Sequence, residues 1–164
     1  MKSNEIISRR DTISKEITKY WGIIRAENLV EKSYKRNYDL KALLKKIEEL
    51  AAERTNMKLY QQCINMGYTS LSQFPANSLF PTIFELSEVN ERFVQLGLIK
   101  TLDPKLKSKK GKVNLNKSEE LTSQYITNLQ NALKLRTIEL KKKIDEYNNT
   151  ADLDITKPLM LLVA

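Results

Sequence analysis

The feature that most constrains the fold is an apolar pattern that runs from Leu40 to Met66 without a glycine or a proline. Its apolar residues recur at steps of three, four or seven, which aligns them along one stripe of an α-helix. The stripe consists of Leu40, Leu43, Ile47, Leu50, Met57 and Ile64, and it is interrupted by Arg54 and Gln61. A helix of this length spans roughly 40 Å and is only marginally stable alone in water. It therefore needs a partner along the whole stripe.

The preceding segment, residues 3–32, is predicted to be that partner. Ser3 is a suitable N-cap, and one helical stripe carries Ile6, Ile13, Ile17, Tyr20 and Ile24. Residues 33–39, SYKRNYD, are expected to form the break, with Asp39 capping the second helix and Gly67 ending it. We therefore predict that the first two helices pack as an antiparallel hairpin.

The second half of the chain predicts two further helices joined by irregular segments. Residues 68–82 contain two prolines, and we expect this loop to be held on the helices by Leu71, Phe74, Leu79 and Phe80. A capping box of Thr82 and Glu85 predicts a third helix over residues 83–96. Its apolar stripe is Ile83, Leu86, Phe93 and Leu96. A fourth helix is expected over residues 118–148, with a stripe of Leu121, Tyr125, Leu129, Ala132, Arg136, Leu140, Ile144 and Tyr147.

The chain of 164 residues is thus expected to be all-α, an elongated antiparallel bundle of about four helices. Residues 1–155 would form a single helical domain, and residues 156–164 an apolar C-terminal tail. Only four glycines and four prolines are present, which disfavours a sheet of many strands and tight turns. Val113 and Leu115 alternate with polar residues, so one short β-hairpin is expected near residues 98–116.

Positive charge is concentrated in one segment. The chain carries a net charge of +8, and residues 100–117 hold seven lysines and one aspartate, a local +6, which leaves +2 for the rest. The segment has no arginine, which would bind phosphate through two hydrogen bonds, and no aromatic residue to stack on bases. We expect it to contact an acidic protein surface, with weak and non-specific nucleic-acid binding as the alternative. The candidate residues are Lys105, Lys107, Lys109, Lys110, Lys112 and Lys117.

Residue types that common catalytic and metal sites require are scarce. There is no histidine, and Cys63 is the only cysteine, which excludes a Ser-His-Asp triad, a CxxC pair and an internal disulfide. Neither a GxGxxG nor a GxxxxGK[ST] loop is present. The adjacent acids Glu48–Glu49 and Glu119–Glu120 are expected to be solvated helix surface, because sequence neighbours on a helix point in different directions. We expect a non-enzymatic protein without catalytic residues, metal, cofactor or small-molecule substrate.

Apolar surface favours interaction with other proteins. The helical stripes can leave apolar patches uncovered, and such patches usually mark partner sites. The tail should also dock, because a free apolar end promotes aggregation; its docking residues would be Leu159, Met160, Leu161, Leu162 and Val163. We expect a homo-oligomer or a component of a larger assembly, and the tail could dock on its own domain or on a neighbouring subunit. No apolar run approaches the roughly 20 residues of a membrane span, and the N-terminus lacks the apolar region of a signal peptide, so a cytoplasmic location is expected.

Three helical segments cover most of the chain: SRRDTISKEITKYWGIIRAENLVEKS (8–33), YDLKALLKKIEELAAERTNMKLYQQCIN (38–65) with its closing Ile-Asn pair, and KVNLNKSEELTSQYITNLQNALKLRTIELKKKIDEYNNTADL (112–153). Together they resemble the septicolysin-like family of small bacterial and phage proteins. The resemblance implies a helical, ring-like homo-oligomer, located in the virion if a phage encodes it, with no family catalytic residue. Residues 68–82 and 155–164 depart from the family pattern. The family name suggests a membrane-lytic toxin, an activity that we do not expect without a signal peptide.

Overall fold

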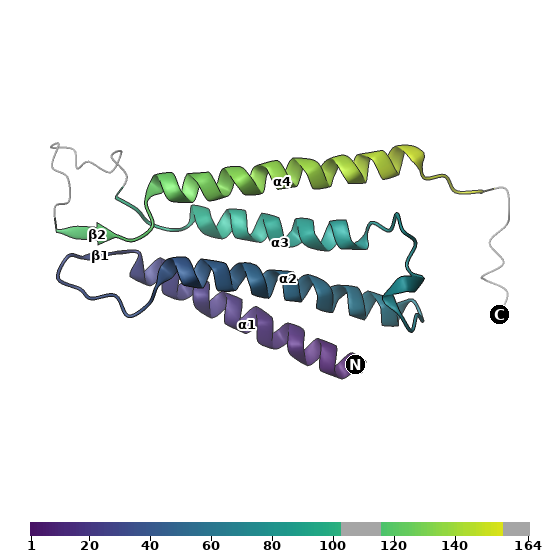
Figure 1. The fold of residues 1–164 in the computed structure, drawn as a ribbon, viewed down its shortest axis with the longest axis horizontal. Helices are drawn as coiled ribbons and strands as arrows, with labels where there is room; N and C mark the ends of the chain where they lie inside the picture. The colour runs from purple at the N-terminus through teal and green to yellow at the C-terminus, as the bar shows by residue number, and fades with distance from the viewer. Residues whose placement is uncertain (103–115, 156–164) are drawn as a thin grey trace.

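The computed structural model describes residues 1–102 and 116–155, which form four α-helices, a short 3-10 helix and a two-stranded sheet (Figure 1). In chain order the elements are α1 (Ser3–Glu27), β1 (Leu29–Glu31), α2 (Leu40–Asn65), η1 (Leu71–Gln73), α3 (Phe80–Gly97), β2 (Lys117–Glu119) and α4 (Ser123–Thr150). Successive helices run antiparallel, and α3 lies between α2 and α4 in Figure 1. The predicted fold class, a mostly helical bundle with a small β element, is confirmed.

The first two helices pack against each other as the predicted hairpin. α1 buries Ile6, Ile13, Ile17, Trp21 and Ile24, and α2 buries Leu40, Ile47, Leu50, Ala51, Met57 and Cys63. Trp21 takes the fully buried place that the sequence pattern assigned to Tyr20, which packs at the edge of the core. Ile64 was wrongly placed in the stripe, since it is 38% exposed.

The ends of these two helices follow local rules with two exceptions. The side chain of Asp39 accepts a hydrogen bond from the backbone of Ala42, and Gly67 has a positive φ of 74°, as expected for a cap and a stop signal. Lys2 rather than Ser3 precedes α1, and its backbone N–H donates to the Glu5 carboxylate at 2.7 Å. α1 also ends at Glu27, short of residue 32, because the residues that follow pair with β2.

The third helix starts earlier than the sequence indicated. α3 begins at Phe80, so Thr82 lies inside its first turn and the predicted capping box is wrong. Pro81 is tolerated there because the first backbone N–H groups of a helix have no intrahelical partner. The loop before α3 is held by a row of aromatic contacts from Tyr68 through Phe74 and Phe80 to Phe84. Within this predicted anchor set Leu71 is exposed, as is Ile83 of the predicted α3 stripe.

The sheet joins segments that are far apart in sequence. β1 and β2 are antiparallel, with Leu29 opposite Glu119 and Glu31 opposite Lys117. Only β2 adjoins the range 98–116 in which a hairpin was expected, and its partner β1 comes from residues 29–31. Val113 and Leu115 lie outside the described residues. Because residues 117–119 are extended, α4 starts at Ser123, with Thr122 as its N-cap.

The fourth helix contributes less to the core than its predicted stripe suggested. Leu121 precedes the helix and is fully buried, and Ile126 and Leu140 are its buried residues. Tyr125, Leu129 and Leu133 pack partly buried against the core, whereas Ala132 is exposed. α3 and α4 pack closely along their length. The charged pair Arg136–Glu85 links them on the surface, and it lowers the pKa of Glu85.

Candidate docking site at the sheet end

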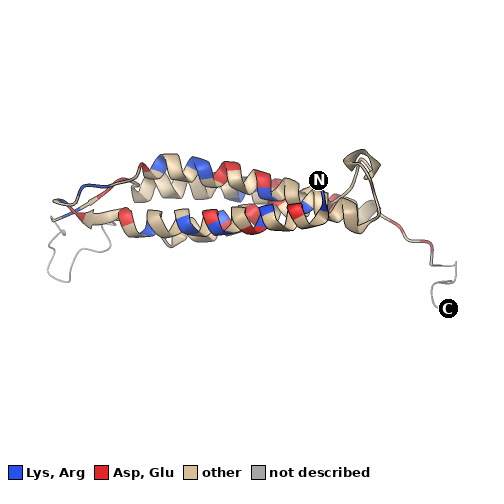
Figure 2. Cartoon of the chain, turned by 90° about the horizontal axis from the view of Figure 1, so that it is seen from below, with Lys and Arg blue, Asp and Glu red and all other residues tan. Residues whose placement is uncertain are grey.

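One end of the bundle gathers the sheet, residues 32–39 and residues 98–102, and we call it the sheet end (Figure 1). Figure 2 shows lysine and arginine on its loops, in the view from below. The chain passes through this end before and after the lysine-rich segment, at Leu102 and Asn116. Of the predicted contact residues, Lys117 lies in β2, and Lys105, Lys107, Lys109, Lys110 and Lys112 lie outside the described residues.

Asn28 is the buried anchor of the sheet end. It follows α1 directly, and its side chain is 0% exposed. The Nδ2 group donates to the carbonyl oxygens of Lys100 and Leu121 at 2.9 and 3.0 Å. The Oδ1 atom accepts from the backbone N–H groups of Glu120 and Leu121 at 3.2 and 2.7 Å. One side chain thus ties the residues on both sides of the lysine-rich segment to the end of α1.

Further bonds hold the same two chain ends. The backbone N–H of Lys32 donates to the carbonyl oxygen of Asn116 at 2.7 Å, next to the β1–β2 pair. The backbone N–H of Leu102 donates to the Glu119 carboxylate at 2.6 Å. The chain therefore enters and leaves the lysine-rich segment at fixed points of the sheet end.

The acids of the sheet end are largely occupied by the fold itself. Three of them accept hydrogen bonds from backbone N–H groups: Glu119 from Leu102, Glu120 from Leu40 at 2.8 Å and Asp39 from Ala42 at 3.1 Å. Glu119 and Glu120 were wrongly expected to be solvated helix surface, since both are half-buried and neither is in a helix. Glu27 accepts from the hydroxyl of Tyr34 at 2.7 Å, a hydrogen bond that raises the pKa of Tyr34.

The lysines of the sheet end, in contrast, remain available. Lys32, Lys35 and Lys100 are exposed, and Lys117 is half-buried. None of the four forms an ion pair with a described residue. A carboxylate that accepts such a hydrogen bond keeps its negative charge, and Glu31 of β1 is exposed. The described cations and acids of this end are therefore nearly balanced, and its net positive charge comes mainly from residues 103–115, which contain five lysines and one aspartate.

The two arginines nearest to the sheet differ in how far they are engaged. Arg36 donates to three backbone carbonyl oxygens, those of Glu27, Asn28 and Ser118, at 2.8 to 2.9 Å. Arg25 donates to the side chain of Gln95 at 2.6 Å. The Arg36 guanidinium is therefore not free to make the planar two-bond contact that arginine makes with phosphate. Arg25 is exposed and is bonded to the described residues through Nη1 alone, so its Nε and Nη2 groups remain available.

A second polar feature lies in the middle of the bundle, at the position where Arg54 interrupts the apolar stripe. Its guanidinium donates to both carboxylate oxygens of Glu88 at 2.7 and 2.6 Å, to the Glu91 carboxylate, and to the hydroxyl of Ser14 at 3.2 Å. Lys58 donates to Glu88 at 3.1 Å. We call these five residues, which come from α1, α2 and α3, the Arg54 cluster.

The centre of the Arg54 cluster is buried, whereas the Glu91 side chain at its edge is 41% exposed. Its two cations and two carboxylates balance in charge. The side chains of Glu88 and Arg54 are 3% and 12% exposed. Burial lowers the pKa of Arg54, but the hydrogen bonds and charges of Glu88 and Glu91 outweigh it and the pKa is raised. The sequence pattern identified Arg54 only as an interruption of the apolar stripe of α2. The charged residue at an interior stripe position was itself the signal that a buried carboxylate must face it.

Comparison of the chain with known proteins identified no relative. No protein-family model, curated protein or solved structure matches the chain. Within residues 1–102 and 116–155, no helix combines the length and the apolar character that crossing a membrane requires. The predicted docking residues Leu159, Met160, Leu161, Leu162 and Val163 lie outside the described residues.

Proposed function

We propose that this protein is a non-enzymatic assembly protein that docks through its sheet end on an acidic surface of a partner protein. The observation that carries the proposal is the unequal use of charge at this end. Three of its carboxylates bind backbone N–H groups, while none of its lysines forms an ion pair with a described residue. The lysine-rich segment starts and ends at the same place and adds five further lysines.

A nucleic acid is the alternative partner, and the arginines argue against it. Specific readers of nucleic acid rely on arginine for phosphates and base edges and on aromatic side chains for stacking. Arg36 is bonded to three carbonyl oxygens of the protein, and residues 103–115 contain neither arginine nor an aromatic residue. Lysine ammonium groups serve well as point charges opposite carboxylates. An acidic protein surface therefore fits this end better.

The proposal is tested with a variant in which Lys105, Lys107, Lys109, Lys110 and Lys112 become glutamine. The probe is fluorescently labelled poly-L-glutamate, whose binding is measured by anisotropy from about 50 to 200 mM salt, a range over which the screening of exposed charges increases. Each exposed charge pair contributes about 0.2–1 kcal/mol, so losing five should weaken binding about fivefold or more. The affinity of the unaltered protein should fall as salt rises.

The matched control changes five exposed helix lysines to glutamine, namely Lys15, Lys19, Lys134, Lys141 and Lys143. Both variants carry a net charge of +3, from +8 minus five. Docking at the sheet end predicts that the control retains most of the affinity. Equal losses in the two variants would show that only total charge matters, which contradicts the proposal. Tighter binding of a DNA duplex than of poly-L-glutamate at physiological salt would favour the nucleic-acid alternative. The logarithm of the DNA-binding constant should then fall with the logarithm of the salt concentration with a slope of about −4.5, for five phosphate contacts.

Self-association is a second candidate function, favoured by exposed apolar side chains on α4. Leu135 and Ile138 are 64% and 62% exposed and lie three residues apart, on one face of the helix. Val94 of α3 and Leu98, which directly follows that helix, are exposed as well. The septicolysin-like resemblance also implies a homo-oligomer.

Light scattering after size-exclusion chromatography tests self-association. At tens of micromolar, an oligomer would give a mass at a multiple of 19.0 kDa, and changing Leu135 and Ile138 to serine should shift the mass toward 19.0 kDa. The same change at Asn128 and Asn131, exposed polar residues of the same helix, should leave the mass unaltered. A strict monomer in the unaltered protein would contradict self-association while leaving docking on a partner open to its own test.

A further inference from the structure

A cavity of about 250 Å³ lies between α2 and α4. α3 contributes Leu96 to its lining and α1 contributes Trp21. The remaining apolar wall comes from Leu44 and Ile47 of α2 and from Leu129 and Leu133 of α4. α2 and α4 do not pack directly on each other along their length, because α3 lies between them in Figure 1. The cavity therefore occupies a groove that the helix packing leaves open.

Two hydrogen-bond donors in this lining have no partner. The indole Nε1–H of Trp21 and the Nε–H of Arg92 are buried and form no hydrogen bond within the described part of the chain. Trp21 as a whole is only 2% exposed. A buried donor without an acceptor costs about 1–3 kcal/mol, so such groups in a native protein usually have a partner. Both atoms are shielded by neighbouring protein atoms, so an acceptor in the cavity could reach them only if the Trp21 or Arg92 side chain moved.

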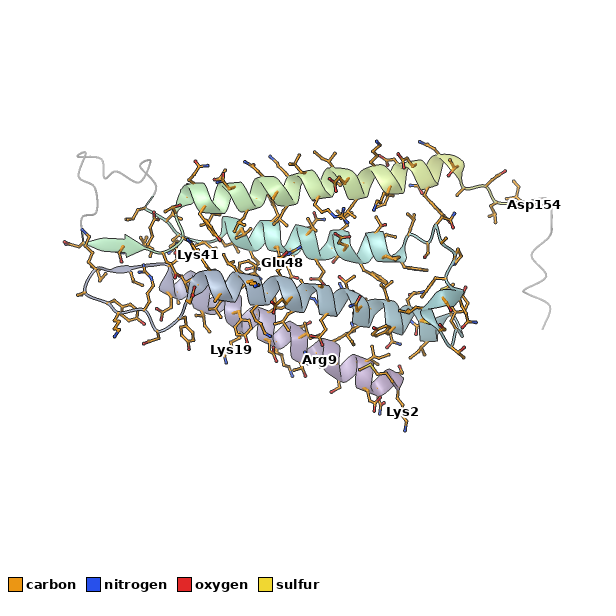
Figure 3. The ribbon with its side chains drawn as sticks, in the orientation of Figure 1. Lys2, Arg9, Lys19, Lys41, Glu48 and Asp154 are labelled. Carbon is orange, nitrogen blue, oxygen red and sulfur yellow. The ribbon has the colours of Figure 1, made fainter. Side chains whose placement is uncertain are left out.

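Charged side chains surround the same cavity and are mostly positive. Lys41, Lys45 and Arg92 line it together with one carboxylate, that of Glu48, which gives a local charge of +2. Figure 3 labels Lys41 and Glu48 on α2. The ammonium group of Lys41 lies 4.7 Å from the centre of the Tyr125 ring, and neither Lys45 nor Arg92 forms an ion pair with a described residue. An acceptor that carries negative charge suits these surroundings.

We propose that this cavity binds a small amphipathic organic anion, an apolar body that bears a single carboxylate. The carboxylate would lie near Lys41, Lys45 and Arg92, the positively charged residues of the lining. The apolar body would contact the leucine and isoleucine walls. The volume lies just below the roughly 300–1,000 Å³ of pockets for drug-sized ligands, so the ligand is expected to be smaller than a drug.

The composition of the lining distinguishes this ligand from others. A purely apolar molecule would leave the excess positive charge of the lining unbalanced, and an organic cation would add to that charge. Sequence analysis anticipated no small-molecule site, because the lining residues come from all four helices and share no motif. The proposal does not depend on docking through the sheet end.

The test uses the full chain and octanoate as the probe, with octanol as its uncharged counterpart. Trp21 is the only tryptophan, so its fluorescence reports directly on the cavity. Octanoate should change the emission saturably, below the concentration at which it forms micelles, and isothermal titration calorimetry should show one site. Octanol should bind at least about tenfold more weakly than octanoate. Absence of a saturable change, as expected if water alone fills the cavity, or equal binding of both probes, would overturn the proposal.

Two variants locate the site. Ala132→Phe places a ring in the cavity from an exposed position on α4, and it should abolish octanoate binding with the helical circular dichroism retained. Changing Lys41 and Lys45 to glutamine should weaken octanoate about 2- to 20-fold, since each exposed charge contributes about 0.2–1 kcal/mol. The control changes Lys15 and Lys19, an exposed lysine pair with the same spacing on α1, and should bind like the unaltered protein. If the control weakens binding as much as the Lys41/Lys45 variant, the anion is not bound in this cavity.

Discussion

Replacing Arg54 by methionine is expected to destabilise the protein by about 3–5 kcal/mol. The substitution keeps most of the side-chain volume but removes the guanidinium that makes two hydrogen bonds to Glu88. The Glu88 side chain is 3% exposed and cannot reach bulk water, so its carboxylate would be left with Lys58 alone. Urea unfolding followed by circular dichroism measures the change in the free energy of unfolding.

A double variant separates loss of the interaction from burial of an unpaired charge. Replacing both Arg54 and Glu88 with apolar residues, by Arg54→Met and Glu88→Leu, should recover about half or more of the loss, because exchanging a buried pair for apolar side chains is often nearly neutral. Arg9→Met is the control, since Arg9 and Glu53 pair on the surface with both side chains 36% exposed, and its loss should be much smaller. If Arg54→Met cost no more than Arg9→Met, the Arg54 cluster would not stabilise the bundle.

Replacing Asn28 by alanine is expected to destabilise the protein by about 3–5 kcal/mol. The side chain is fully buried and makes four hydrogen bonds to the backbone of Lys100, Glu120 and Leu121. Each buried backbone group left without a partner costs about 1–3 kcal/mol. Asn28→Asp should be at least as damaging despite its similar shape, because a carboxylate oxygen would then face two carbonyl oxygens. Urea unfolding gives the free energies.

Hydrogen exchange adds a local readout for Asn28. The backbone N–H of Leu121 donates to Asn28 at 2.7 Å, so its exchange should accelerate strongly in the alanine variant. Exchange in the middle of α1 and α2 should rise only as far as global stability falls. Asn128→Ala on the exposed face of α4 should change stability by less than about 0.5 kcal/mol. An alanine variant of Asn28 within 1 kcal/mol of the unaltered protein would contradict its role as anchor.

The Arg54 cluster and Asn28 hold two different parts of the fold in place. The Arg54 cluster fixes α1, α2 and α3 relative to one another in the middle of the bundle. Asn28 fixes the sheet end, from which the lysine-rich segment departs. A loss of either anchor should therefore affect function through geometry as well as through stability.

The sequence by itself determined the features that depend on neighbouring residues. The stripes of α1 and α2 follow from side chains three and four positions apart, and Asp39 and Gly67 mark helix ends through bonds within a few residues. The concentration of lysine between residues 100 and 117 is likewise a property of the chain alone. These interactions are local, so their outcome is nearly independent of the rest of the fold.

Only the tertiary structure decided the features that depend on partners distant in sequence. The pairing of β1 with β2 ends α1 early and delays α4, across more than eighty intervening residues. Hydrogen bonds between residues 17 to 80 positions apart turn Glu119 and Glu120 toward backbone N–H groups and match Arg54 with Glu88. The packing of the helices also brings Trp21 and Arg92 to one cavity. The free energy of burying a polar group depends on the partner that it finds. In this fold such partners come from other elements, so the chain's local sequence does not reveal them.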